Sequence, residues 1–292
     1  MTPIKVLLIH RESDVYRHLT GWWSYPVDEF EWQTLKVKPD YFIADMNYAP
    51  AHDLIVLDDW IFGQIKNRTA PLAYVVVDSA RSAAQLARNR QQAQDADLIL
   101  VDSDRLDSFN GLGKSVQRFA YAVNEHLFMP REKVYDVAFL CWPTDDRRMV
   151  QRWCADICKR HGWSFVTGTY DWDHYARFLS QARIVVHRAH VMNARSWRVF
   201  DVMAARGCLL SSPLPDVSGD GLISGTHYRE YTDAETLEGQ LSILLDYGYW
   251  KVIAEAGYRH VMEHHTWHVR AAQLRSMLTE VFHHDQDKMA LW

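Results

Sequence analysis

The chain has 292 residues and a net charge of −5, with 48% hydrophobic and 24% charged residues. This composition excludes a disordered chain, and its acidic balance means that a nucleic-acid partner would need a local basic patch. The length fits two domains of ordinary size.

The cysteines and the N-terminus indicate the compartment. Four cysteines in a chain of this length do not make a disulfide framework, and we expect buried free thiols. The N-terminus lacks the length and the small-residue cleavage site of a signal peptide, and no stretch approaches the roughly 18 apolar residues of a membrane-spanning helix. These features predict a cytoplasmic protein without a membrane span.

Short apolar runs alternate with helical segments in the first half of the chain, the pattern of a parallel sheet with helices on both faces. The predicted strands are residues 6–9, 54–57, 74–77 and 98–101. Three strands end in a polar residue: His10, Asp58 and Asp78. Because open α/β sheets bind ligands outside the carboxyl ends of their strands, these side chains are candidates by position.

Aromatic residues gather in a loop-like segment of the first half. They are Trp22, Trp23, Tyr25 and Trp32. Aromatic faces suit a sugar or an extruded base, and a core role beneath a long loop is an equal alternative. Farther along, Arg81, Arg88 and Arg90 share one predicted helix.

The alternation restarts after residues 124–133, which contain turn residues without periodicity, so we divide the chain into domains 1–128 and 129–292. A polar helix with Arg147 and Arg148 near its start is predicted, and Asp233 is a predicted N-cap. The other predicted elements are strands 134–140, 164–166, 184–186 and 208–210, and helices 173–181, 197–206, 251–263 and 266–282.

The common dinucleotide and P-loop motifs are absent. The first strand leads into His10-Arg-Glu-Ser13, where a dinucleotide-binding protein needs G-x-G-x-x-G, and the chain has no G-x-x-x-x-G-K-[ST]. These absences argue against a nicotinamide-dependent or P-loop enzyme.

Residues 198–216 form the most informative segment. Arg198 and Asp201 lie three apart in the first turn of a predicted helix, on a different face from Phe200 and Met203. A helix N-terminus favours a phosphate, and a carboxylate one turn later can accept hydrogen bonds from two ribose hydroxyls. The alternative is an acid that stabilises the helix dipole beside a surface arginine.

This segment resembles the C-terminal domain of GT-B glycosyltransferases, particularly the spore-maturation-type group of the large retaining superfamily. That group has an Arg-x-Phe-Glu-x-x-Ala-x-Gly helix and further motifs in a fixed order. The corresponding stretches here are 198–207, 231–233, 253–257 and 265–270, with 135–139, Arg147-Arg148 and 182–186 before them. The resemblance is dense over about residues 135–275.

The resemblance implies a GT-B architecture, with two facing Rossmann-like domains and a C-terminal helix that crosses back to the N-terminal domain. It places Asp201 where the family has the Glu that binds the donor ribose, and Asn193 where the superfamily has another Glu. Because Asn193 is not an acid, both retaining and inverting transfer stay open. Arg147 or Arg148 would bind the pyrophosphate, and the Gly168–Tyr170 turn would hold the nucleobase.

The implied activity is transfer of a sugar from a nucleotide-diphosphate sugar to an acceptor hydroxyl. We rank Asp78, then His10, then Asp58 as the base, with Trp22, Trp23 and Arg81 on the acceptor side. The acceptor is a hydroxymethylated pyrimidine in phage-type DNA or a glycan. The alternatives are a sugar-nucleotide epimerase or phosphorylase, and a non-catalytic sugar-nucleotide-binding module.

We expect neither a cofactor nor a metal, because the cations would stabilise the leaving diphosphate. Three Asp pairs (58–59, 102–104 and 171–173) mimic the metal-binding motif of another glycosyltransferase class. Pairs of acids at this spacing are frequent by chance, and a metal site needs several oxygen ligands. His264, His265 and His268 lie around the start of the predicted closing helix with no cysteine nearby, and we expect no zinc site there.

Overall fold

The computed structural model describes residues 4–11, 30–37, 52–58, 68, 70–76, 82–103, 105–169, 172–189, 196–215 and 217–282. The chain forms two compact units. The first unit comprises Met1–Ala120 and Trp267–Trp292, and the second comprises Tyr121–Thr266.

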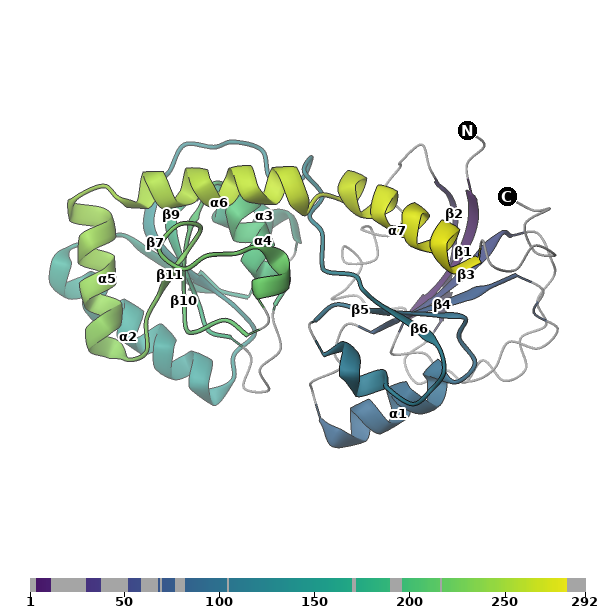
Figure 1. The fold of residues 1–292 in the computed structure, drawn as a ribbon. Helices are drawn as coiled ribbons and strands as arrows, with labels where there is room; N and C mark the ends of the chain where they lie inside the picture. Colours follow the sequence, from purple (N-terminus) through teal and green to yellow (C-terminus); the bar gives the residue numbers. More distant parts are fainter. Residues whose placement is uncertain are drawn as a thin grey trace. The chain divides into compact units, whose positions relative to one another are not determined.

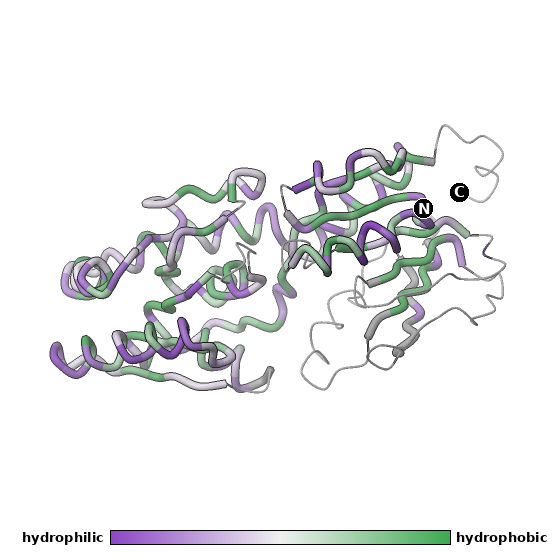
Figure 2. The backbone as a smooth tube through the Cα atoms, turned by 90° about the horizontal axis from the view of Figure 1, so that it is seen from below, coloured by the Kyte–Doolittle hydropathy of each residue, from purple (hydrophilic) through white to green (hydrophobic). Residues whose placement is uncertain are grey.

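The described strands of the first unit form a six-stranded parallel sheet in the order β2-β1-β3-β4-β5-β6. They are β1 (Ile4–Arg11), β2 (Phe30–Val37), β3 (Leu54–Asp58), β4 (Leu72–Val76), β5 (Leu98–Val101) and β6 (Ser115–Arg118). Four of them correspond to the predicted strands. Figure 2 shows these inner strands as mostly hydrophobic stretches, because both faces of the sheet are covered.

The two outer strands of this sheet are absent from the sequence-based prediction. Trp32, which we expected in a loop-like segment, lies in β2, so that interpretation is wrong. Among the described strands, β2 and β6 each pair with a single neighbour, and they contain more polar residues than the central strands. An edge strand with half-exposed positions gives no continuous apolar run, which explains why it is difficult to predict.

Helices cover both faces of the first sheet (Figure 1). Helix α1 (Ala83–Ala93) and the short helix η2 (Leu106–Phe109) lie on one face, with Phe109 and Ala93 in that core. On the other face, α7 (Trp267–Phe282) buries Leu274 and Leu278 against β-strand residues such as Val6 and Leu100. The last described helix therefore completes the first unit, as expected for a helix that crosses back.

The described strands of the second unit form a five-stranded parallel sheet in the order β11-β10-β9-β7-β8. They are β7 (Tyr135–Leu140), β8 (Phe165–Gly168), β9 (Ala182–His187), β10 (Cys208–Ser211) and β11 (Arg229–Glu230). The helices are α2 (Asp145–His161), α3 (Trp172–Gln181), α4 (Arg198–Ala204), η3 (Ser218–Asp220), α5 (Ala234–Asp246) and α6 (Trp250–His264). All four predicted strands are confirmed.

The second sheet is also covered on both faces (Figure 1). Helices α2 and α5 pack on one face and α3 and α4 on the other, while α6 contributes to both cores. Asp233 caps α5 in a reciprocal arrangement with Thr236, as the sequence predicts. Two Rossmann-like units and a returning C-terminal helix are thus confirmed.

The cysteines are free thiols, and Cys154, Cys158 and Cys208 are buried, in agreement with the sequence-based expectation. Within the described ranges, each helix is too short or too polar to span a lipid bilayer.

Candidate functional site

The carboxyl edge of the second sheet gathers polar side chains from several elements. His187 is the last residue of β9, and Ser211 is the last residue of the neighbouring strand β10. Arg188 follows His187, Arg147 lies in the first turn of α2, and Arg198 begins α4. The parallel topology brings these residues together, since β7, β9 and β10 end at the same edge.

His187 lies at the centre of this cluster and is 1% exposed. Its Nδ1 atom is 3.0 Å from the hydroxyl of Ser211, and its backbone carbonyl accepts a hydrogen bond from the Tyr231 hydroxyl at 3.1 Å. Burial, followed by the charges of Arg198, Arg147 and Arg188, lowers the pKa of His187 well below its usual value. The ring is therefore neutral at physiological pH.

The three arginines are held by contacts that leave much of their charge unpaired. Arg147 donates to the carbonyl of Trp142 at 3.3 Å, and burial and the Arg198 charge lower its pKa. Arg188 forms a long ion pair with Asp146 at 3.6 Å. Arg198 is buried and lies over the Trp197 ring, 5.3 Å from its centroid. Among the described residues, Arg147 and Arg198 have no ion pair within 4.0 Å.

Three buried nitrogen atoms of the cluster have no hydrogen-bond partner in the part of the chain that the structure describes. They are Nε2 of His187, Nε of Arg188 and Nε of Arg198. Buried polar atoms are nearly always paired in proteins, so unpaired ones need an explanation. The oxygens of an anion are acceptors of the kind that the arginine nitrogens lack.

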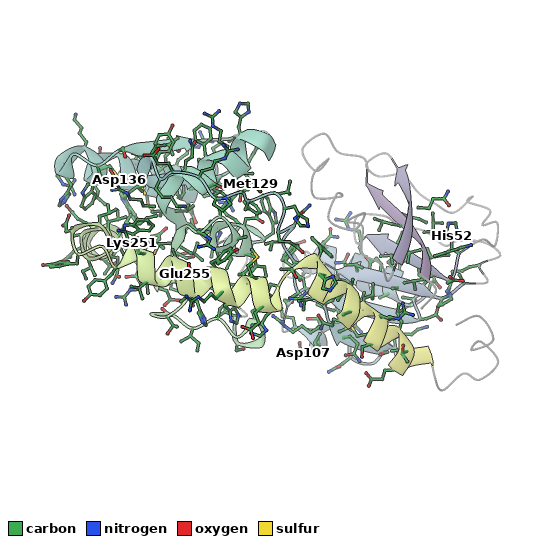
Figure 3. All side chains as sticks on the ribbon, turned by 90° about the horizontal axis from the view of Figure 1, so that it is seen from above. His52, Asp107, Met129, Asp136, Lys251 and Glu255 are labelled. Atoms are coloured by element: carbon green, nitrogen blue, oxygen red, sulfur yellow. The ribbon has the colours of Figure 1, made fainter. Side chains whose placement is uncertain are left out.

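The opposite edge of the same sheet is different. Asp136, near the start of β7, accepts hydrogen bonds from the backbone and hydroxyl of Ser164, both at 2.8 Å, and pairs with Arg183. Figure 3 labels Asp136 there, and Glu255 on α6, which pairs with Arg206 and Arg259. At these places acids pair with the arginines, which differs from the carboxyl edge.

The predicted donor residues on α4 are more buried than the sequence indicates. All seven residues of this helix are buried, including Arg198 at 8% and Asp201 at 5% exposure, so the separate polar face that we expected is absent. Tyr175 on α3 donates a hydrogen bond to Asp201 at 3.3 Å. Burial raises the pKa of Asp201 to about 8, and Arg198 and the Tyr175 hydrogen bond partly oppose this effect.

The structure separates the two neighbouring arginines that sequence reasoning treats alike. The charge of Arg147 acts to lower the pKa of His187 and of Cys141, and Arg147 and Arg198 repel each other. The side chain of Arg148, in contrast, is 61% exposed and lies 3.9 Å from Asp145. Gly168 ends β8 at the same edge, where its carbonyl accepts a hydrogen bond from Cys141. Tyr170 and Asn193 lie outside the described residues.

The predicted acceptor side falls largely outside the described ranges. His10 and Asp58 lie at the carboxyl ends of β1 and β3, but their side chains are not described. The other residues predicted for this side, which are Asp78, Trp22, Trp23 and Arg81, lie outside the described residues. Their roles stay predictions.

Sequence reasoning missed His187, Arg188 and Ser211. The signal was available, because His187 and Ser211 end predicted strands in the way that His10 and Asp78 do. In the described part of the chain, no group of three or more His, Cys, Asp or Glu residues could hold a metal ion.

Comparison with known families gives a match over half of the chain. The sequence profile of the glycosyl transferase-like family matches residues 126–276. This range includes Arg147, Arg188 and Arg198 around His187, which we call the cationic cluster. Among curated proteins, none matches this sequence.

Several solved structures share the fold at low sequence identity. Sucrose-phosphate synthase from Thermosynechococcus elongatus is 11% identical with a TM-score of 0.64, over 97% of this chain and 100% of that one. Anabaena HepE, in complex with UDP and glucose, is 11% identical with a TM-score of 0.61, over 95% and 100%. The pneumococcal O-GlcNAc transferase GtfA, with UDP and GlcNAc, is 11% identical with a TM-score of 0.55, over 79% and 57%. This chain has the GT-B fold.

Proposed function

This chain belongs to the glycosyl transferase-like family, and we propose that it transfers a sugar from a UDP-sugar to an acceptor hydroxyl without a metal ion. The observation that carries the proposal is the set of unpaired buried nitrogen atoms on His187, Arg188 and Arg198. A diphosphate has the charge and the acceptor oxygens that these nitrogen atoms lack.

The cationic cluster would act on the leaving group. In the transfer, the acceptor oxygen forms a bond to the anomeric carbon, the bond from that carbon to the diphosphate breaks, and the diphosphate leaves with the electron pair. Negative charge thus develops on the diphosphate, where Arg147, Arg188 and Arg198 would stabilise it. Because these residues already supply positive charge, turnover should persist in the presence of a chelator.

The acceptor hydroxyl must lose a proton as it attacks. Asp78 remains our first candidate for the base, before His10 and Asp58, because each lies at or near the carboxyl end of a predicted strand of the first half. Trp22, Trp23 and Arg81 remain candidates for acceptor binding.

The donor assignment has two supports. The profile match covers the cationic cluster, and HepE and GtfA, which share the fold, are both in complex with UDP. For the donor nucleoside, Asp201 would bind the ribose, and Gly168, Tyr170 and Asn193 would lie near the base or the sugar, by resemblance to the family.

For the acceptor, a glycan is better supported than modified DNA. The net charge is −5, and Arg90 on α1 already donates hydrogen bonds to the carbonyls of Ser108 and Asn110. A site for a hydroxymethylated pyrimidine would therefore depend on Arg81 and Arg88. DNA binding that weakens steeply with salt would favour the DNA acceptor.

Two further functions are distinguishable by experiment. Release of nucleoside diphosphate only when an acceptor is added would argue against a sugar-nucleotide epimerase or phosphorylase. Asn193, in place of an acid, favours a non-catalytic sugar-nucleotide-binding module, which would bind donor without turnover. The four free cysteines support our proposal of a reducing, cytoplasmic location.

Calorimetry with UDP, followed by an assay of UDP release from UDP-sugars with a panel of acceptor glycans, tests the proposal. We expect binding of UDP and acceptor-dependent release in the presence of a chelator. A folded protein that binds no nucleoside diphosphate would contradict the donor assignment, and activity restored only by added metal would contradict metal independence.

A further inference from the structure

The two ring nitrogens of His187 have different surroundings. Nδ1 lies 3.0 Å from the Ser211 hydroxyl, which is itself fully buried. Nε2 has no partner among the described residues, although it is equally removed from water. An unpaired buried nitrogen is destabilising, so a ligand that pairs with it would bind with a gain in free energy.

The surroundings of the two nitrogens indicate which one carries the single proton of the ring in the free protein. The imidazole is neutral because burial and the charges of Arg198, Arg147 and Arg188 oppose its protonation. A buried N–H without a partner is rarer in proteins than a buried acceptor without one, so the unpaired Nε2 atom carries the lone pair. The proton therefore resides on Nδ1, which donates to the oxygen of Ser211.

A bound anion reverses this preference. A phosphate oxygen accepts hydrogen bonds and has no proton to donate, so it requires a donor at Nε2. The serine hydroxyl permits the change, because it has one O–H donor and two lone pairs and can rotate to donate to Nδ1. In exchange with solvent water, Nδ1 releases its proton and Nε2 takes up another, so the ring stays neutral and the total number of protons is unchanged.

We propose that His187 binds a phosphate oxygen of the donor through Nε2–H, and that its ring changes from the Nδ1–H to the Nε2–H tautomer when the phosphate binds. Ser211 stabilises both tautomers, first as acceptor and then as donor. This inference rests on the proposed function, to which it adds a binding residue and a proton rearrangement. A neutral histidine adds a directed hydrogen bond to the site without a fourth positive charge.

The direct test is the tautomer of the wild-type protein. Selective ¹⁵N-histidine labelling and long-range ¹H–¹⁵N correlation spectra report which ring nitrogen carries the proton, and the signal that disappears in His187→Gln identifies the residue. We expect a protonated Nδ1 in the free protein and a protonated Nε2 after addition of UDP or inorganic pyrophosphate. Uridine, which has no phosphate, should leave the tautomer unchanged.

Two variants of His187 separate binding at Nε2 from packing against Ser211. His187→Asn keeps an amide near the position of Nδ1 but has no group at Nε2, whereas the longer His187→Gln extends an N–H donor toward that position. We expect His187→Asn to bind UDP about tenfold or more weakly, with unchanged uridine affinity, and His187→Gln to keep most of the UDP affinity. His161→Gln is the control, since His161 contacts Glu238 and Trp163 at the far end of α2.

The outcomes distinguish the inference from the function on which it rests. Wild-type protein that binds neither UDP nor pyrophosphate contradicts both. Wild-type protein that binds UDP while Nε2 stays unprotonated overturns the inference alone, as does unchanged UDP affinity in folded His187→Asn. If that variant does not fold, the wild-type spectra decide.

Discussion

The Tyr175 hydroxyl on α3 donates a hydrogen bond of 3.3 Å to the Asp201 carboxyl group on α4, and both side chains are buried. Because burial raises the pKa of Asp201 to about 8, this acid is mostly protonated at neutral pH. A protonated Asp201 leaves the charge of neighbouring Arg198 free to act on an anion.

Asp201→Asn should change the pH dependence of stability. The pKa in the folded protein is about 8, above the ordinary value of 3.8, so the stability contributed by this group is full below about pH 4 and falls as the pH rises to about 8. Asparagine does not ionise, so the variant should lose less stability over this range, by up to a few kcal/mol. Urea denaturation at several pH values measures the difference. Parallel pH profiles for both proteins would contradict the raised pKa.

The two adjacent arginines of α2 should differ in their effect on nucleotide binding. Arg147→Ala should weaken UDP binding about tenfold, because its charge reaches His187 and Arg198, and a charge-assisted hydrogen bond contributes about 1.5–3 kcal/mol. Arg148→Ala should have little effect, since this side chain is 61% exposed. Calorimetry of both variants provides the comparison, and equal losses of affinity would refute the distinction.

Gly257 on α6 should not tolerate a side chain. A Cβ atom there would lie 2.8 Å from the His227 carbonyl and 3.1 Å from Cγ of Met203, so Gly257→Ala should lower the free energy of unfolding by about 1–3 kcal/mol. The control is Gly239→Ala on α5, where no atom lies within 4 Å. That change should stabilise the protein by about 0.5–1 kcal/mol, because alanine favours the helix. Denaturation midpoints with the same sign for both would show that close helix packing is not the cause.

Arg270 connects α7 to Ala120, the last residue of the N-terminal segment of the first unit. Its Nε donates to the carbonyl of Ala120 at 2.8 Å, and its side chain is 5% exposed. Arg270→Met should cost about 1–3 kcal/mol of unfolding free energy, since the Ala120 carbonyl loses a charged donor. Gln273→Met removes a 3.4 Å bond to the Arg118 carbonyl and the 3.0 Å hydrogen bond that Gln273 accepts from Arg270, but it leaves Arg270 bonded to Ala120 and should cost less. Equal destabilisation would argue against a specific role for Arg270.

The sequence predicts the central strands and the capped helices well, because their signals are local. The runs at Leu54–Leu57 and Leu98–Val101 are continuous apolar segments, and Asp233 has the side chain that an N-cap requires. Strand β2 lacks such a signal, since Glu31, Gln33 and Lys36 interrupt it. Its pairing with β1 comes from tertiary contacts that periodicity does not report.

The candidate site divides in the same way. The order of the motifs predicts Arg147, Arg198 and Asp201 as donor-binding residues. The proposed role of His187, in contrast, depends on its neighbours across the sheet. Only the pairing of β9 with β10 places Ser211 beside His187, and only the fold brings the arginine charges to its ring. The burial of Arg198 and Asp201 could not be predicted from the sequence of the seven-residue helix α4 either, because two polar residues in one helix suggest an exposed face.

The place of α7 in the chain determines the order in which the protein can fold during synthesis. The second unit, Tyr121–Thr266, is continuous, so all of its residues are available once Thr266 has left the ribosome. The first sheet is made earlier, yet one of its faces is covered by Ala271, Leu274, Met277 and Leu278, which are made later. The apolar side chains of that face therefore stay uncovered in the nascent chain while the second unit is synthesised, and exposed apolar surface of this kind favours aggregation of a folding intermediate.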